Sequence, residues 1–517
     1  MSLNQSMNIS VGSMKNNQYA LTVVSQNIAN LHVEGYHRQR VNFVTNEYTT
    51  NCENVISTIK GMNGASISSL SDYIDDAAFK GLLDSNSEAE YYNTLADALG
   101  ELEGIADDLG DNGLNALLND FYAAAANLEK FPTDMSIRQQ YVQAAQNVCE
   151  KFNEISSKCE SVQEDKFNTI GTNVEHINSL LENLAKANEA HVKNNQGSST
   201  KVEINNILQE LSNYTNVKTE ANANGSINVF IGDVALVQGG ELKYTLEADF
   251  DANNPNSAVN FSLKSTQNPD YIITNGVNDA FASGSMKAYV EFLNGSNENY
   301  TNINDLKNAI NNAASAFAVA LNDIQTFGSY DEGVFAAALG ADANGNTILI
   351  EANEPMFTTK DGSNNFNASN IQINSAIIED PFLVAAARID LANYTDADGN
   401  IDPNWIKSVG NSDNATKITA LQNEKICVYN NGKNKCTLNE FLTNNAAKTG
   451  MDIAAVQTKA DTANDIANAD IVNYSNLIGV NLDEELADMI KYQRAYEASA
   501  KLFSTINDLM GTIIGMV

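Results

Sequence analysis

The chain has 517 residues, enough for several domains, and its 65 acidic against 30 basic residues give a formal net charge of −35. Such an acidic balance argues against nucleic acid and against an anionic membrane surface as partners. No run approaches the roughly 18 apolar residues of a membrane-spanning helix, and residues 1–30 lack the features of a secretory signal peptide. These tests indicate a cytosolic protein, unless export uses a route that reads an uncleaved N-terminus.

The first predicted element is a helix over residues 1–31. Its apolar residues follow the three- and four-residue spacing of a coiled-coil seam, with Ser10 and Asn17 as polar breaks. A helix with one apolar face is marginally stable alone, so this segment needs a partner. The seam residues are Leu3, Met7, Met14, Leu21, Val24, Ile28 and Leu31.

The middle of the chain alternates between helical and strand-like patterns. Residues 32–86 are expected to be irregular with short strands, and residues 87–196 to form long helices. Breaks in these helices are predicted near 110–113, where glycines occur, and at 131–134, around a proline. The later predicted elements are a short helix at 202–214, strands over 217–275, a helix at 303–327, a loop-rich segment over 330–410, and helices at 412–423 and 437–479.

The last predicted element is a second heptad helix. The simplest expectation is that the two terminal helices pair with each other. Terminal helices that need each other favour a self-assembling subunit over an enzyme. Two ordinary amphipathic helices docked on one globular core explain the spacing equally well. The apolar positions of this helix are Leu482, Leu486, Met489, Tyr496, Phe503, Met510, Ile514 and Val517.

These elements predict a mainly α fold with β insertions, an α+β multidomain chain. The terminal heptad helices pair into a coiled-coil-like inner domain, a helical bundle forms the middle domain, and β-rich outer domains are inserted in mid-sequence. Both ends are nearly neutral, so the acidic middle is expected to face solvent. The predicted domains are 1–45 with 475–517, 46–200 with 300–330 and 412–474, 201–299, and 331–411.

Two of the five cysteines, Cys427 and Cys436, flank an Asn431-Gly432 dipeptide, which is a strong signal for a two-residue hairpin turn. Counting outward from that turn, the two cysteines face each other at a non-hydrogen-bonded position, where side chains come closest. A disulfide is geometrically feasible, and two reduced thiols are an equally acceptable alternative. The other cysteines are expected to be small buried side chains: Cys52, Cys149 and Cys159.

No pattern of catalytic or metal-binding residues is recognisable. The four histidines, His32, His37, His176 and His191, lack the spacing of a metalloprotease helix, and no nucleotide-binding or nucleophile-elbow motif occurs. The acidic segments 342–346 and 396–402 lack the glycine and acid positions of an EF-hand and are read as Asx turns. The sequence therefore predicts no catalytic residue, no cofactor and no metal, and a protein that is not an enzyme.

Two short motifs lie beside the heptads. Asn27-Ile28-Ala29-Asn30, followed by Gly35-Tyr36 and by Arg38-Gln39, resembles the N-terminal signature of bacterial flagellar rod, hook and hook-associated proteins. Residues 479–486 and 492–498 resemble the matching C-terminal signature of that family. The helical segment 87–196 and the segments 225–232 and 367–387 resemble the hook-associated members more than the rod or hook subunits.

The resemblance implies a structural subunit at the hook–filament junction, in which the terminal helices form the inner tube of an axial assembly. It implies a ring of about eleven copies, with hook protein on one side and a second junction protein or flagellin on the other. Secretion through the flagellar type III apparatus, a dedicated chaperone on the C-terminal helix and an extracellular location are also implied. We expect the terminal helices to be disordered or loosely helical before assembly.

The expected assembly interface combines the heptad positions with the motif residues. Gly35 is expected to supply an unusual backbone angle where the chain turns from the inner tube to the outer body. Alternatives are a distal rod or hook subunit, a cell-wall hydrolase, and a soluble binding module. The interface residues are Met7, Met14, Leu21, Val24, Asn27, Ile28, Asn30, Gly35, Tyr36, Arg38, Gln39, Asn481, Leu482, Leu486, Met489, Gln493, Tyr496 and Phe503.

Overall fold

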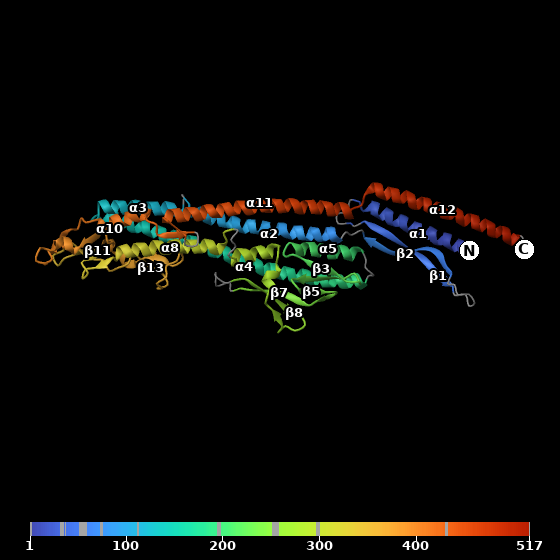
Figure 1. Ribbon diagram of the computed structural model, residues 1–517, viewed down its shortest axis with the longest axis horizontal. Helices are drawn as coiled ribbons and strands as arrows, with labels where there is room; N and C mark the ends of the chain where they lie inside the picture. The colour runs from blue at the N-terminus through green and yellow to red at the C-terminus, as the bar shows by residue number, and fades with distance from the viewer. Residues whose placement is uncertain are drawn as a thin grey trace.

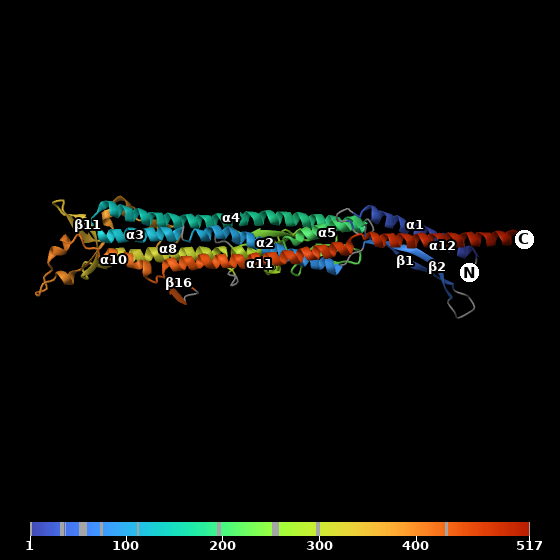
Figure 2. The ribbon, with the colours of Figure 1, turned by 90° about the horizontal axis from the view of Figure 1, so that it is seen from above.

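The computed structural model is elongated, with both termini at one end of its long axis (Figures 1 and 2). A module made by the two ends of the chain is followed by a helical body, and a small β domain lies at the far end. A second β domain lies along the flank of the body (Figure 1). The structure describes residues 3–31, 36, 38–50, 59–72, 76–110, 113–193, 198–250, 258–295, 300–429 and 433–515.

The terminal module pairs α1 (Leu3–Ala29) with α12 (Leu482–Gly515). The helices are antiparallel, because Ser13 in the first half of α1 meets Ser499, with 2.8 Å between their hydroxyl oxygens, and Asn27 near the end of α1 meets Glu485, which comes earlier in α12. An antiparallel hairpin of β1 (Gln39–Thr50) and β2 (Ile59–Asp72) packs on α1. The predicted pairing of the terminal helices is confirmed.

The buried face of α1 differs from the predicted heptad stripe. Its buried residues include three polar ones, because α1 packs against both α12 and the hairpin, and small side chains allow the close approach. Of the predicted stripe, Val24 is buried, whereas Met7, Met14, Leu21 and Ile28 are half-buried. The buried residues of α1 are Ser10, Asn17, Ala20, Val23, Val24 and Asn27.

The helical body contains the predicted long helices with both predicted breaks. α3 ends at Lys130 and α4 begins at Met135, on either side of Pro132. α11 begins at a capping box in which Thr437 and Glu440 bond each other's backbone amides. The helices of the body are α2 (Asp76–Asp107), α3 (Leu114–Lys130), α4 (Met135–Lys193), α5 (Ser198–Ser212), α7 (Ser285–Asn294), α8 (Ile303–Gln325), α10 (Asp413–Ala420) and α11 (Leu438–Ile478).

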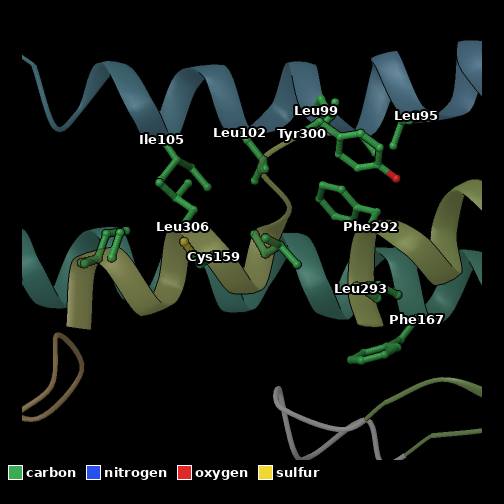
Figure 3. Close-up of a cluster of buried hydrophobic side chains, with 14 of the residues drawn as sticks. Leu95, Leu99, Leu102, Ile105, Cys159, Phe167, Phe292, Leu293, Tyr300 and Leu306 are labelled. Atoms are coloured by element: carbon green, nitrogen blue, oxygen red, sulfur yellow. The ribbon is translucent and has the colours of Figure 1, made fainter. Parts of the chain in front are cut away.

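One contiguous hydrophobic core runs through this body. Figure 3 shows a part of it, where a row of α2 side chains faces Leu306 of α8 and Phe292 of α7, with Cys159 and Phe167 of α4 below. The row has the spacing of one helix face: Leu95, Leu99, Leu102 and Ile105.

The segment 32–86 was predicted incorrectly in two respects. β1 and β2 have 12 and 14 residues and are long rather than short. Residues 76–86 belong to α2 rather than to an irregular segment, although they are rich in small polar residues. Phe79, Leu82 and Leu83 recur at helical spacing and are buried in the main core, and the alanines and leucines of this segment favour a helix.

The β-rich insertions confirm the predicted mainly α fold with β insertions. The flanking domain has a four-stranded sheet in the order β3-β4-β5-β6 and a three-stranded sheet β7-β8-β9, together with α6 (Val277–Ala280). The strands are β3 (Lys218–Ala221), β4 (Ile227–Ile231), β5 (Val234–Gln238), β6 (Glu241–Leu242), β7 (Tyr244–Asp249), β8 (Asn260–Ser265) and β9 (Ile272–Ile273).

The distal domain is built around β11 (Val334–Ala341), which pairs with β10, β12 and β15. Trp405 packs edge-on to Phe335 in its small core. The other elements from here to α11 are β10 (Gly328–Ser329), β12 (Thr347–Glu351), β13 (Phe357–Thr359), β14 (Ile371–Ile373), α9 (Ser375–Glu379), η1 (Pro381–Leu383), β15 (Ala387–Asp390), η2 (Leu391–Tyr394), η3 (Pro403–Lys407), η4 (Leu421–Asn423), β16 (Cys427–Tyr429) and β17 (Asn434–Cys436).

None of the helices in the described part of the chain combines the length and the hydropathy that crossing a membrane requires.

A half-buried carboxylate, Glu291, makes the stability of the body depend on pH. Burial opposes the charge of Glu291, but hydrogen bonds from Tyr300 and Tyr91, each 2.6 Å, and from Lys287 lower its pKa below the usual value. A carboxyl with a lowered folded pKa stabilises the fold above its unfolded pKa of about 4.3 and loses that contribution as pH falls through the folded value.

We expect Glu291→Gln to lower the free energy of unfolding by about 1 kcal/mol at pH 7 and by much less at pH 3. Urea unfolding of both proteins at each pH measures the difference. A difference that is the same at both pH values would contradict this role for the carboxylate.

Candidate assembly site at the joined termini

Near the end of α1, the side-chain amide of Asn27 makes all the hydrogen bonds of which it is capable. The Asn27 Nδ2 donates to the Gln39 carbonyl oxygen at 2.9 Å and to Glu485 Oε2 at 3.0 Å. The Asn27 Oδ1 accepts from the Tyr36 hydroxyl at 2.9 Å and from the Gln39 backbone N–H at 3.0 Å. An asparagine amide has two donors and an acceptor with two lone pairs, so all of its capacity is used here.

Glu485 links this amide to an arginine. Its side chain is 1% exposed, and its Oε1 accepts from Arg38 Nε at 2.6 Å. The Arg38 guanidinium also contacts Glu484 and lies 3.7 Å from Asp488, while its backbone N–H donates to the Ile478 carbonyl at 2.9 Å. The network therefore joins α1, the chain after it, the end of α11 and the start of α12.

The electrostatics favour the charged pair. Burial disfavours the charge of Arg38, but attraction to Glu485 and hydrogen bonds to Glu484 and Glu485 outweigh it, so the pKa of Arg38 lies above its usual value. The carboxylates also lie in the first turn of α12, where the helix dipole favours negative charge. A buried ion pair fixes geometry more than it adds stability, because any other register would leave a charge buried alone.

Some of the predicted motif residues belong to this hydrogen-bond network, and others lie outside it. Asn481 caps α12, since its Oδ1 accepts from the Asp483 N–H at 3.0 Å. The Asn30 side chain lies outside the network and donates to the Gln26 carbonyl one turn earlier, at 2.9 Å. Gly35, with His32 and His37, lies outside the described residues. Asn27, Tyr36, Arg38 and Gln39 come together as hydrogen-bonded neighbours.

The predicted apolar positions of α12 are only partly covered within one chain. Met489 and Phe503 are half-buried, whereas Leu482 and Leu486 are each 42% exposed, and Gln493 and Tyr496 are also exposed. Five further aliphatic side chains of α12 are exposed: Ile490, Leu502, Leu509, Ile513 and Ile514, of which Ile514 is a predicted seam position. Exposed apolar side chains gathered on one helix are typical of a surface that another molecule covers.

The sequence interpretation missed Glu485, the most buried charged partner in the module. It also missed Glu484 and Asp488, the other carboxylates around Arg38. A signal was present, because Glu485 lies within the C-terminal motif and Arg38 within the N-terminal one. Nothing in the local pattern shows that the two residues, 447 positions apart, meet.

The paired cysteines have the predicted register. Cys427 faces Cys436 across β16 and β17, both are buried, and both are free thiols in this structure. The Cys436 Sγ lies 3.9 Å from the Cys427 carbonyl oxygen. Burial, reinforced by the neighbouring Cys436, raises the pKa of the Cys427 thiol to about 12, so this thiol is protonated at neutral pH.

The remaining candidates are structural. His176 contacts Glu210 and His191 contacts Thr200, and no cluster of metal-binding side chains occurs among the residues that the structure describes. The acidic loops are the predicted Asx turns, in which Asp342 and Asp396 accept backbone N–H groups of the residues two and four positions later.

Comparisons with known proteins point in one direction. The model of the family "Flagellar hook-associated protein FlgK helical domain" matches residues 99–339, and that of "Flagellar basal body rod FlgEFG protein C-terminal" matches residues 473–516. The chain is 25% identical to flagellar hook-associated protein 1 of Bacillus subtilis over 96% of this chain and 95% of that protein. It is 20% identical to the protein of the same name from Salmonella typhimurium, over 96% and 97% of the two chains.

A solved structure has the same fold. The flagellar hook junction protein FlgK from Burkholderia pseudomallei superposes with a TM-score of 0.59 at 13% identity. The match covers 77% of this chain and 99% of that one.

Proposed function

Because this chain belongs to the family of flagellar hook-associated protein 1, we propose that it is a structural subunit at the hook–filament junction and assembles there through its terminal helices. The observation that carries the proposal is the network of Asn27, Arg38 and Glu485, which joins the two ends of the chain into one rigid module. The family motifs of both ends contribute to this network, and the exposed aliphatic side chains of α12 lie beside it.

The exposed side chains of α12 fall on two sides of the helix. At about 100° per residue, Leu482 and Leu486 point to one side, and Leu502 and Leu509 point roughly to the opposite side, with α1 packed between them. Two different faces on one helix suit a heterologous contact, in which each copy binds one neighbour through each face. Such contacts close into a ring or continue as a helical tube.

The partners follow from this position. The chain would contact copies of itself, about eleven in a ring, with hook protein on one side and a second junction protein or flagellin on the other. An export chaperone would cover the apolar C-terminal helix before secretion through the flagellar type III apparatus to the cell exterior. Ordering of the terminal helices would accompany assembly, since burial of apolar area offsets the loss of chain entropy.

The predicted division into domains is part of this proposal. Residues 1–45 with 475–517 would form the inner tube, and the helical body with its two insertions would face outward, where an acidic surface is well solvated. The hairpin of β1 and β2 packs on α1, which favours placing it with the inner domain.

A distal rod or hook subunit is the second candidate. The match of residues 473–516 to the model described as basal body rod FlgEFG protein C-terminal favours it. The match of residues 99–339 to the hook-associated helical domain favours the junction. The similar proteins named above are structural, which gives no support to a catalytic role.

A strain that lacks the gene distinguishes these positions. We expect hooks without filaments by electron microscopy, with flagellin lost to the medium. Missing hooks would place the chain in the rod or hook, and intact flagella would overturn the proposal.

Leu486→Asp and Leu21→Asp are each expected to abolish filament attachment. An aspartate in an apolar contact buries an unpaired charge, whereas the helical body has a separate core and stays folded. Ile378→Asp in the distal domain is the control, because Ile378 is similarly exposed but lies far from the termini. Counting filaments per cell and measuring helix content by circular dichroism test this, and normal motility of either variant would contradict the inner-tube role.

A disulfide between Cys427 and Cys436 is also proposed. Two thiols would lose two electrons and two protons to an external disulfide by thiol–disulfide exchange. Treatment of the folded chain with oxidised glutathione, followed by mass spectrometry of peptides, is expected to show this cross-link with Cys149 and Cys159 still reduced. In a second sample the chain is unfolded in urea and refolded with oxidised glutathione present. If Cys427 and Cys436 are still free thiols in that sample, the disulfide is excluded.

A further inference from the structure

The hairpin of β16 and β17 carries positive charge on a strongly acidic protein. Residues 425–436 contain three lysines and no acidic residue, in a chain with a net charge of −35. Lys425, Lys433 and Lys435 are exposed, and none of them forms an ion pair within the described residues. The nearby Glu440 carboxylate is used in the cap of α11, where it accepts the Thr437 N–H at 2.9 Å.

The strand pattern explains the direction of these side chains. Successive residues of a strand point to opposite faces, and the inward face of this hairpin carries the buried Cys427 and Cys436. Val428 pairs with Lys435 on the outward face, where Val428 is 48% exposed. Figure 2 shows that the hairpin projects from the side of the body. Its outer face therefore presents an aliphatic side chain among lysines.

An uncharged recess lies beside this face. A hollow of about 420 Å³ is lined by residues of the hairpin, α8 and α11, among them Val428 and Val319, which is also exposed. The lining residues carry no charge: Asn312, Ser315, Ala316, Val319, Ile426, Cys427, Val428 and Phe441. The recess mixes apolar side chains with Asn312 and Ser315, and it lies beside a hairpin that carries exposed lysines. Mixed polar and apolar surfaces of this kind occur in protein contacts.

We propose that the β16–β17 hairpin docks on the acidic helical body of a second copy of this chain. This inference rests on the proposed function, which places copies side by side. Bodies that each carry most of a charge of −35 repel one another, and a basic projection that meets exposed carboxylates removes part of that repulsion. The recess would receive an aliphatic side chain of the neighbour. The hairpin thus adds an outer contact to the one made by the terminal helices.

Photo-crosslinking in isolated flagella tests the contact directly. The full chain is expressed with Val428→p-benzoylphenylalanine, and with Val192→p-benzoylphenylalanine on α4 as a matched exposed valine. Irradiation is expected to join position 428 to the body of a second copy, near acidic residues, as mapped by mass spectrometry. A link to a different protein or to a cell-wall polymer, or no link at all, would overturn the proposal.

Charge reversal provides the second measurement. Lys425→Glu/Lys433→Glu/Lys435→Glu, in the crosslinking background, is expected to lower the yield about tenfold, whereas Lys186→Glu/Lys193→Glu on α4 leaves it unchanged. An equal yield in both would contradict the electrostatic contact. Absence of the unmodified chain from isolated flagella would instead refute the junction role itself, so the two failures are distinguishable.

Discussion

Glu485→Ala is expected to leave cells with hooks but almost no filaments, whereas Glu484→Ala keeps near-normal filament numbers. Both carboxylates contact Arg38, but Glu485 is 1% exposed and Glu484 is 60% exposed. Removing one partner of a buried pair costs about 3 kcal/mol or more, and removing an exposed partner less than about 1 kcal/mol. The adjacent carboxylates therefore form a matched pair of variants that differ in burial.

The effect of Glu485→Ala follows from what the carboxylate connects. Its two oxygens accept from Asn27 and from Arg38, so its loss removes the direct link between α1 and the start of α12. The register of the two helices then depends on the Ser13–Ser499 hydrogen bond and on apolar contacts, which permit sliding more readily than a hydrogen-bonded network does. The exposed leucines of α12 would no longer stand at fixed positions for a neighbouring copy.

Electron microscopy of complemented deletion strains measures the filament number, and the amount of secreted chain in the medium controls for export. Glu485→Gln separates charge from shape, and we expect an intermediate number of filaments because the amide keeps the packing. Equal filament numbers for Glu485→Ala and Glu484→Ala would show that the network does not position the terminal helices.

Local signals explain which parts of the fold were predictable. Helices at 412–423 and 437–479 were predicted close to their observed bounds, because capping residues and turn residues mark their ends. The register of Cys427 with Cys436 followed from the position of one Asn-Gly dipeptide. These features depend on residues that are close together in the sequence, so one sequence is enough to predict them.

Features that depend on distant segments were not predictable. The heptad pattern indicated that α1 has a partner and placed Ser10 and Asn17 in the seam as polar breaks. It did not select Ala20 and Val23, which are also buried. That face is set by the β1–β2 hairpin as well as by α12. In the same way, the burial of Glu485 depends on Arg38 at the other end of the chain.

Arg138→Met is expected to destabilise the join between the helical body and the distal domain by about 3 kcal/mol. Arg138 is 1% exposed, in the first turn of α4. Its Nε donates to the Pro132 carbonyl at 2.6 Å, and its Nη1 donates to the carbonyls of Pro381 and Val384 at 3.2 and 2.7 Å. Burial lowers the pKa of Arg138 to about 10, with partial compensation from Asp380.

The hydrogen-bond acceptors of Arg138 explain why its replacement destabilises the fold. A buried ion pair can often be replaced by two apolar side chains, because both charges leave together. Here the acceptors are backbone carbonyls, which no substitution removes, so methionine leaves them buried without a donor. The carbonyls of Pro381 and Val384 lie on the loop around η1, between the helical body and β15 of the distal sheet.

Fluorescence of the single tryptophan reports the result, because Trp405 lies in the core of the distal domain. We expect urea to unfold this domain at a clearly lower concentration in Arg138→Met. Arg388→Met is the control: that guanidinium stacks 3.7 Å from the centre of the Phe327 ring, a contact whose loss costs about 1 kcal/mol at a half-exposed site. If both variants shift the midpoint equally, Arg138 does not anchor the distal domain, and other contacts, such as the hydrogen bonds of Gln325 and Asn414 to this segment, do so.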